Sequence, residues 1–91
     1  MIPTHRPPTS AGEMLLEKYL KPMGMTQMEA ARRMAMPLNR LNEIVHGKRG
    51  ISADSALRLS NLLGTTLEFW MNLQAATDLY RASQKRELAH R

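Results

Sequence analysis

The residues best suited to chemistry in this sequence are polar side chains between Leu38 and His46. Asn39, Arg40 and Asn42 stand there among apolar residues that claim the inner face of a helix. Arginine and asparagine are the side chains that hydrogen-bond guanine and adenine edges in pairs in the major groove. We therefore predict that these three residues read DNA bases. An ordinary solvated helix face is the alternative, and Leu38 would either touch a thymine methyl group or cover the core.

Two pairs of residues that flank this stretch are predicted to contact phosphate groups. Thr26 and Gln27 open an earlier helix, where free backbone N–H groups and short polar side chains suit a phosphate. Lys48 and Arg49 follow the base-reading stretch directly. Residues 32–49 include five basic side chains and one acidic side chain, a local charge of +4. This excess of positive charge favours a polyanionic partner.

The titratable residues do not indicate an active site or a metal site. The six Glu and two Asp stand mostly in first turns of predicted helices or on exposed faces, where capping explains them. His5, His46 and His90 lack the spacing of metal ligands, and the chain has no cysteine. No serine triad and no phosphate-binding loop is visible. We therefore expect no catalysis, no cofactor and no bound metal ion.

Two helices joined by a turn are predicted to position the polar residues. The first begins at a capping box, Thr26-x-x-Glu29. It ends before Pro37, because proline lacks an N–H group and disfavours the helical conformation of its predecessor. Pro37 suits the first turn of the second helix. That helix runs to about His46, and Gly47 stops it. Its apolar positions have helical spacing: Leu38, Leu41, Ile44 and Val45.

Three further helices are expected around this pair, in an all-α fold. Ser10 begins the first, which reaches about Lys21, and Ser52 caps another that Gly64 ends. The last helix extends from about Leu67 to Ser83. The chain thus divides into a flexible arm (1–9), a helix–turn–helix domain including the long last helix (10–83) and a charged tail (84–91).

The last helix is too apolar for a small domain to bury alone. A chain of 91 residues buries only about two-thirds of its unfolded surface, so a second copy would add burial. Phe69, Leu73 and Tyr80 form one apolar line, and Trp70 widens it. We predict a homodimer interface at these four residues, with a purely internal core as the alternative.

The overall composition favours a nucleic-acid partner in the cytoplasm. The net charge is +5 and the isoelectric point is near 10.3, which suits an anionic partner. No stretch approaches the ~18 consecutive apolar residues of a membrane span. The first ten residues lack the apolar segment of a secretory signal. We expect no membrane contact.

The pattern T-Q-x-x-x-A-x-x-M-x-M-x-x-x-x-L-x-x-I-x-x-G-K-R resembles the Cro/C1-type (XRE) helix–turn–helix family. Three more segments resemble one branch of it, the HigA-type antitoxins of bacterial toxin–antitoxin modules. They read PTSAGE (8–13), GISADSALRL (50–59) and LGTTLEFWMNLQ (63–74). Two positions depart from the pattern: Ala35 replaces the usual turn glycine, and Pro37 replaces the usual Ser/Thr cap. These departures put the turn geometry and any contact by residue 37 in question.

The resemblance implies a five-helix, lambda-repressor-like domain with the helix–turn–helix at its second and third helices. It also implies a homodimer that reads an inverted repeat in its own operator and represses its operon. By the same resemblance, the protein neutralises a small ribonuclease toxin of the HigB (RelE-like) class. Two alternatives stay open: a stand-alone XRE-type repressor without a toxin, and a helical interaction module that has lost DNA binding.

Overall fold

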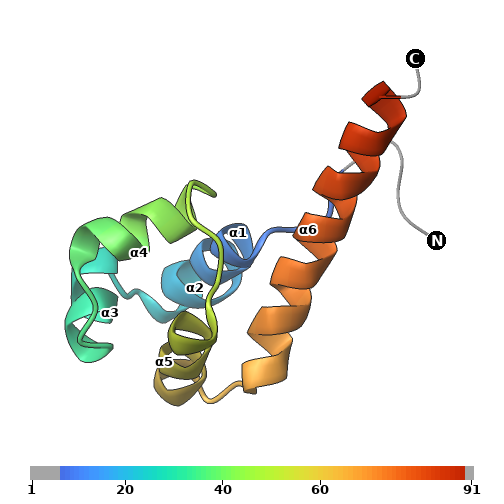
Figure 1. The fold of residues 1–91 in the computed structure, drawn as a ribbon. Coiled ribbons are helices and arrows are strands. Elements are labelled where there is room, and N and C mark those ends of the chain that lie inside the picture. Colours follow the sequence, from blue (N-terminus) through green and yellow to red (C-terminus); the bar gives the residue numbers. More distant parts are fainter. Residues whose placement is uncertain (1–6, 90–91) are drawn as a thin grey trace.

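The computed structural model describes residues 7–89, and the side chains of residues 7–86. Within that range the chain consists of helices joined by short turns, without a strand (Figure 1). The first helical segment is continuous and comprises α1 (Ala11–Met14), a π-helix η1 (Leu15–Leu20) and α2 (Lys21–Met23). Four helices follow: α3 (Gln27–Arg33), α4 (Leu38–Val45), α5 (Ala53–Leu63) and α6 (Leu67–Ala89). The predicted all-α fold, with the helix–turn–helix at the second and third segments, is confirmed.

The first helical segment lies at the centre of the domain and the other helices surround it. In Figure 1, α3 and α4 lie on one side of it, α5 lies below, and α6 passes the opposite side and projects beyond it. The core is small and consists largely of aliphatic side chains. Its largest fully buried side chains are Leu15, Leu20, Leu41, Ile44, Leu59 and Trp70. Every helical segment except α3 therefore contributes at least one of these large side chains, and α3 adds Ala30 and Ala31.

Pro22 lies inside the first helical segment, where a regular α-helix would not accept it. Proline cannot donate to the carbonyl four residues back and its ring crowds that carbonyl. The turns before it are widened into the π-helix, and Lys21 N–H donates to the Leu16 carbonyl five residues back. Gly24 then ends the segment at φ +64°. The helix consequently reaches Met23, two residues past the predicted end at Lys21.

The start of α1 lies directly against the end of α4. A Cβ atom on Gly12 would stand 2.0 Å from the Ile44 carbonyl oxygen and 2.8 Å from the Val45 carbonyl oxygen. Only glycine permits two backbones to approach this closely. Gly12 therefore sets how near α4 lies to the centre of the domain.

The long helix α6 extends to Ala89, six residues beyond the predicted end at Ser83. Residues 84–89 (QKRELA) contain no glycine or proline and consist of good helix formers, so nothing local stops the helix. The charged tail that the sequence suggested is thus helical as far as the structure describes it. The predicted arm, residues 1–9, lies mostly outside the described residues, as do residues 90–91.

Candidate nucleic-acid interface

The start of α3 meets the middle of α4, which brings three of the predicted contact residues together. The Glu29 N–H donates to Thr26 Oγ1 at 3.1 Å, so the predicted cap is confirmed. Asn42 Nδ2 donates to Gln27 Oε1 at 3.3 Å across the two helices. Thr26 and Asn42 are exposed and Gln27 is half-buried. One surface therefore carries two amides and a hydroxyl from both helices.

The turn between α3 and α4 forms in the usual left-handed way although it lacks glycine. Ala35 has φ +52°, the single positive φ of a non-glycine residue among those described. An L-residue in this region costs about 1–2 kcal/mol. Pro37 occupies the N-cap position of α4, at ψ 139°, one residue before the first turn where the sequence placed it. No side chain caps α4, because the ring of Pro37 carries no group that can accept a hydrogen bond.

Arg58, from α5, holds this turn in place. Its Nη1 donates to the Met34 carbonyl at 2.7 Å and to the Ala35 carbonyl at 3.2 Å. These bonds satisfy carbonyl groups at the end of α3 that have no partner within the helix. The sequence gives no local signal for this contact, because 24 residues separate Arg58 from Met34.

Helix α4 directs some of its polar side chains to solvent and one toward α5. Asn39 and Asn42 are exposed, and Leu38 keeps 42% of its surface exposed, so all three lie where they were predicted to act. Arg40 differs. Its Nη2 donates to Asp54 Oδ2 and to Ser55 Oγ, both at 2.8 Å, and only 25% of its side chain is exposed.

Lys48 and Arg49 follow α4 and are both exposed. Arg49 donates to Glu43 Oε1 from Nε at 3.0 Å and from Nη2 at 2.9 Å. Lys48 makes no side-chain hydrogen bond or ion pair within the described part of the chain. The Lys48 ammonium group could thus bind a phosphate without first breaking a bond to another described residue.

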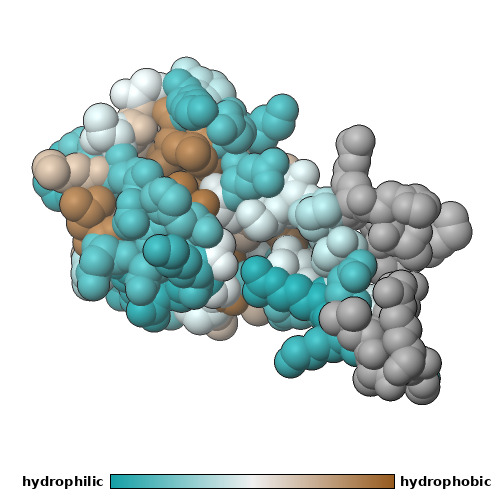
Figure 2. All heavy atoms as spheres, turned by 90° about the horizontal axis from the view of Figure 1, so that it is seen from above, coloured by the Kyte–Doolittle hydropathy of each residue, from teal (hydrophilic) through white to brown (hydrophobic). Residues whose placement is uncertain are grey.

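The surface is less cationic than the count of residues suggests. Arg32 Nη2 and Arg33 Nε donate to Glu29 Oε1 at 2.7 and 2.8 Å. The hydrogen bonds from Arg32, and next from Arg33, hold the pKa of Glu29 below its usual value. Figure 2 looks down on the face that carries α4, where hydrophilic side chains predominate and apolar atoms show only in patches.

A residue of α6 fixes the segment that links α4 to α5. Gln74 Oε1 accepts from the Ile51 N–H at 2.7 Å, and Gln74 Nε2 donates to Asp78 Oδ1 at 2.9 Å. Ile51 itself is buried. Sequence reasoning missed Gln74, because a polar residue on a long helix carries no sign of a partner 23 residues away.

The four residues predicted for a homodimer interface have different environments. Trp70 is 0% exposed, and its Nε1 donates to Thr65 Oγ1 at 2.6 Å, so the whole indole is buried within its own protomer. Assigning Trp70 to an interface requires correction, because a buried ring offers nothing to a second copy. Phe69, Leu73 and Tyr80 are half-buried. Among the α6 side chains that the structure describes, the large apolar ones that remain exposed are Leu67, Met71 and Leu79.

The described residues contain no group of His, Asp or Glu that could hold a metal ion. In the same range, no helix has the length and apolar character needed to cross a bilayer.

Several known proteins resemble this chain in sequence or in fold. Residues 16–70 match the helix-turn-helix family HTH_3. The chain is 43% identical over 81 residues to virulence-associated protein I of Dichelobacter nodosus, covering 89% of this chain and 75% of that protein. It is 40% identical over 80 residues to the antitoxin HigA-1 of Vibrio cholerae, covering 88% and 75%. The solved structure of antitoxin GraA in complex with its operator superimposes with a TM-score of 0.83 at 40% identity, covering 96% of this chain and 88% of that one.

Proposed function

The chain belongs to the helix-turn-helix family HTH_3, and on that premise we propose that it is a sequence-specific DNA-binding antitoxin. It binds an inverted repeat in the operator of its own operon as a homodimer and represses transcription there. It also holds a HigB-like ribonuclease toxin inactive. Similarity to antitoxins, one of them solved with its operator, supports this proposal.

The observation that carries DNA binding is the surface shared by α3 and α4. Thr26, Gln27 and Asn42 converge there, and Asn39 stands exposed near the start of α4. Insertion of α4 into the major groove would present Asn39, Asn42 and Leu38 to base edges, while Thr26 and Gln27 contact phosphates. Lys48 binds the backbone beyond the end of α4, and Arg49 joins it once it exchanges Glu43 for a phosphate. A repressor of this kind works in the cytoplasm.

Dimerisation would use apolar surface of α6. Phe69, Leu73 and Tyr80 stand half-buried along one side of that helix, and Leu67, Met71 and Leu79 are exposed on the rest of its surface. An isologous pairing of two copies would bury exposed apolar surface of α6 and place two recognition helices about one helical turn of DNA apart, ~34 Å.

Two measurements test the proposal. In the first, the small gene adjacent to this one is induced in a sensitive bacterial host, with and without this protein, and colonies are counted. Killing that this protein rescues is the expected result. The second follows binding to the protein's own upstream DNA at several salt concentrations. Lys48→Ala should weaken all duplex binding and lower the salt slope by about one unit.

Each outcome assigns a different function. Upstream DNA binding without killing would leave a plain repressor and remove the toxin from the proposal. Rescue without salt-dependent DNA binding would leave an interaction module. Sedimentation of Leu79→Glu, beside Glu68→Gln as a control on the same helix, tests the dimer. An unchanged dimer would exclude this side of α6 as the interface.

A further inference from the structure

We propose that Arg40 is a positioning residue: Asp54 and Ser55 clasp it, α4 is thereby held in reading position, and bases are read by Asn39 and Asn42. This inference rests on the proposed DNA binding and goes beyond it. It reassigns the one arginine of α4 and so changes which base pairs the protein recognises.

The contacts of Arg40 are those of a structural side chain. Its guanidinium reaches from α4 to the start of α5 and donates to a carboxylate and a hydroxyl, each at 2.8 Å. The hydroxyl belongs to Ser55, which is 1% exposed. Ser55 is itself held by Ser52, since Ser52 Oγ donates to Ser55 Oγ at 3.1 Å. The hydroxyl that accepts from Arg40 is therefore held at the N-terminus of α5 by a second bond.

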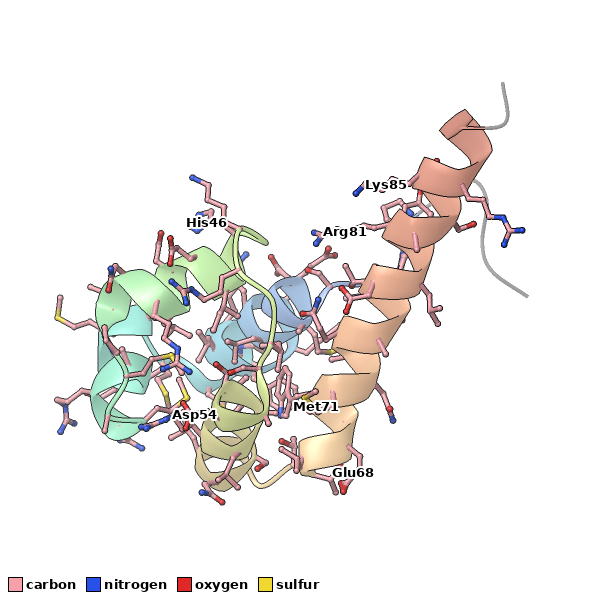
Figure 3. All side chains as sticks on the ribbon, viewed as in Figure 1. His46, Asp54, Glu68, Met71, Arg81 and Lys85 are labelled. Carbon is pink, nitrogen blue, oxygen red and sulfur yellow. The ribbon has the colours of Figure 1, made fainter. Side chains whose placement is uncertain are left out.

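Asp54 joins this site to the turn. Its Oδ2 accepts from Arg40 Nη2 at 2.8 Å and from Arg58 Nε at 3.0 Å. Arg58 in turn binds the carbonyl groups of Met34 and Ala35. Figure 3 shows Asp54 at the start of α5, beside the turn between α3 and α4. The Asp54 carboxylate thus links the recognition helix, through Arg58, to Ala35 in the turn that sets the direction of that helix.

The alternative would require Arg40 to leave two partners, the Asp54 carboxylate and the buried Ser55 hydroxyl, before it touches a base. Withdrawal would leave Asp54 with a single arginine and return the half-buried stem of Arg40 to water. The two arginines, Arg40 first, hold the pKa of Asp54 below its usual value, so the carboxylate stays charged and keeps its hold at neutral pH.

Asn39 and Asn42 face no such cost. Both are exposed, and the one side-chain bond between them and the rest of the described chain is the 3.3 Å contact from Asn42 to Gln27. Asparagine pairs with the N6 and N7 positions of adenine. The inference therefore predicts that each operator half-site is read chiefly at A·T pairs under α4, and that no guanine contact depends on Arg40.

The test compares Asp54→Asn, Arg40→Ala and the double variant, because the two roles of Arg40 predict opposite results. If Asp54 and Arg40 act as one unit, each single variant should weaken operator binding by a factor on the order of ten. The double variant should then bind the operator no more weakly than the single variants. Relative affinities for operators with single base-pair changes keep the wild-type profile in all three. Asn39→Ala, in contrast, flattens the preference at one A·T pair.

A base-reading Arg40 would give a different pattern. Asp54→Asn would free the guanidinium and leave binding unchanged or tighter, and Arg40→Ala would erase the preference at one G·C pair. Either result overturns the proposal. Glu17→Gln removes an exposed ion pair with Lys21, 2.9 Å long and on the first helical segment, and is the matched control. It should change neither affinity nor profile.

A second measurement needs no DNA. It therefore tests the role of Arg40 even if the protein does not bind an operator. In amide NMR spectra, Asp54→Asn should shift the signals of Ala35 in the turn and Asn39 in α4, because Asp54 holds both elements through Arg58 and Arg40. The same signals should stay in place in Glu17→Gln. Unshifted signals in Asp54→Asn would show that the clasp does not position α4. Absence of operator binding by the wild-type protein would instead refute DNA binding itself.

Discussion

The helices α4 and α6 are held in place by opposite means. The recognition helix α4 has eight residues, and its position depends on other elements: Gly12 lets α1 reach its end, and α5 holds Arg40. The long helix α6 has 23 residues and is anchored chiefly by Trp70 near its start. Its distal half projects beyond the domain, where Figure 3 shows Arg81 and Lys85 extending from it.

The contrast reflects length and task. A helix of eight residues is marginal by itself in water, so tertiary contacts must supply its order, and the same contacts fix its orientation. The helix α6 has about six turns, and its contacts with the domain are concentrated in its first half, from Trp70 to Gln74. The free side is then available to a partner. Helix α4 is thus the one that is placed accurately, and α6 is the one that keeps surface free for a partner.

The largest expected effect would come from removing the anchor of α6. Trp70→Ala should destabilise the domain by about 3–5 kcal/mol, because a fully buried indole, its bond to Thr65 and its contacts with Tyr19 and Phe69 are lost. At protein concentrations low enough to keep the chain monomeric, Leu79→Ala on the distal half should cost about 0.5 kcal/mol or less, because Leu79 keeps 59% of its surface exposed in the protomer. Urea denaturation measures both.

A large loss in Leu79→Ala would contradict this contrast. It would mean that the distal half is packed in solution. A dependence of that loss on protein concentration would then identify a second copy as the packing partner.

The next largest effect would come from α4. Gly12→Ala should lower stability by about 1–3 kcal/mol, because the new methyl group meets the Ile44 carbonyl at 2.0 Å and α1 must move away from α4. Within an ordinary helix the same change would be stabilising by up to about 1 kcal/mol. The sign of the change in melting temperature therefore tests the close approach, and a raised melting temperature would refute it.

The smallest effect concerns the turn before α4. Ala35→Gly should raise stability by about 0.5–1 kcal/mol, since glycine adopts φ +52° without the strain of a Cβ atom and this gain exceeds its added chain entropy. Thermal unfolding of this variant beside wild type is the measurement. A lower melting temperature would indicate that Arg58 and its two carbonyl partners already remove the strain.

Most of the fold could be predicted from the sequence because its signals are local. Ser10, Thr26 and Ser52 each accept from the N–H three residues on, and the capping residues could be identified from type and spacing alone. Gly24 and Gly64 end their helices at positive φ for the same local reason. The helix α6 extends past its predicted end at Ser83, because the charged residues that follow favour helix.

The candidate site was only half predictable. Residue type and helical position placed Asn39, Asn42, Thr26 and Gln27 on one surface, and the structure brings three of them together. Neither signal could show that Arg40, also on the polar side of α4, has an acceptor on another helix 14 residues away. The same limit explains Trp70, whose burial depends on what packs over it.

The sequence by itself therefore determined the order of the helices, where they begin and which side chains are chemically able to read DNA, since these depend on neighbours within one or two turns. The tertiary structure alone decided which of those side chains are free to act. A guanidinium binds a base or a carboxylate with similar chemistry, and the choice between them depends on distances that exist only after α5 packs against α4.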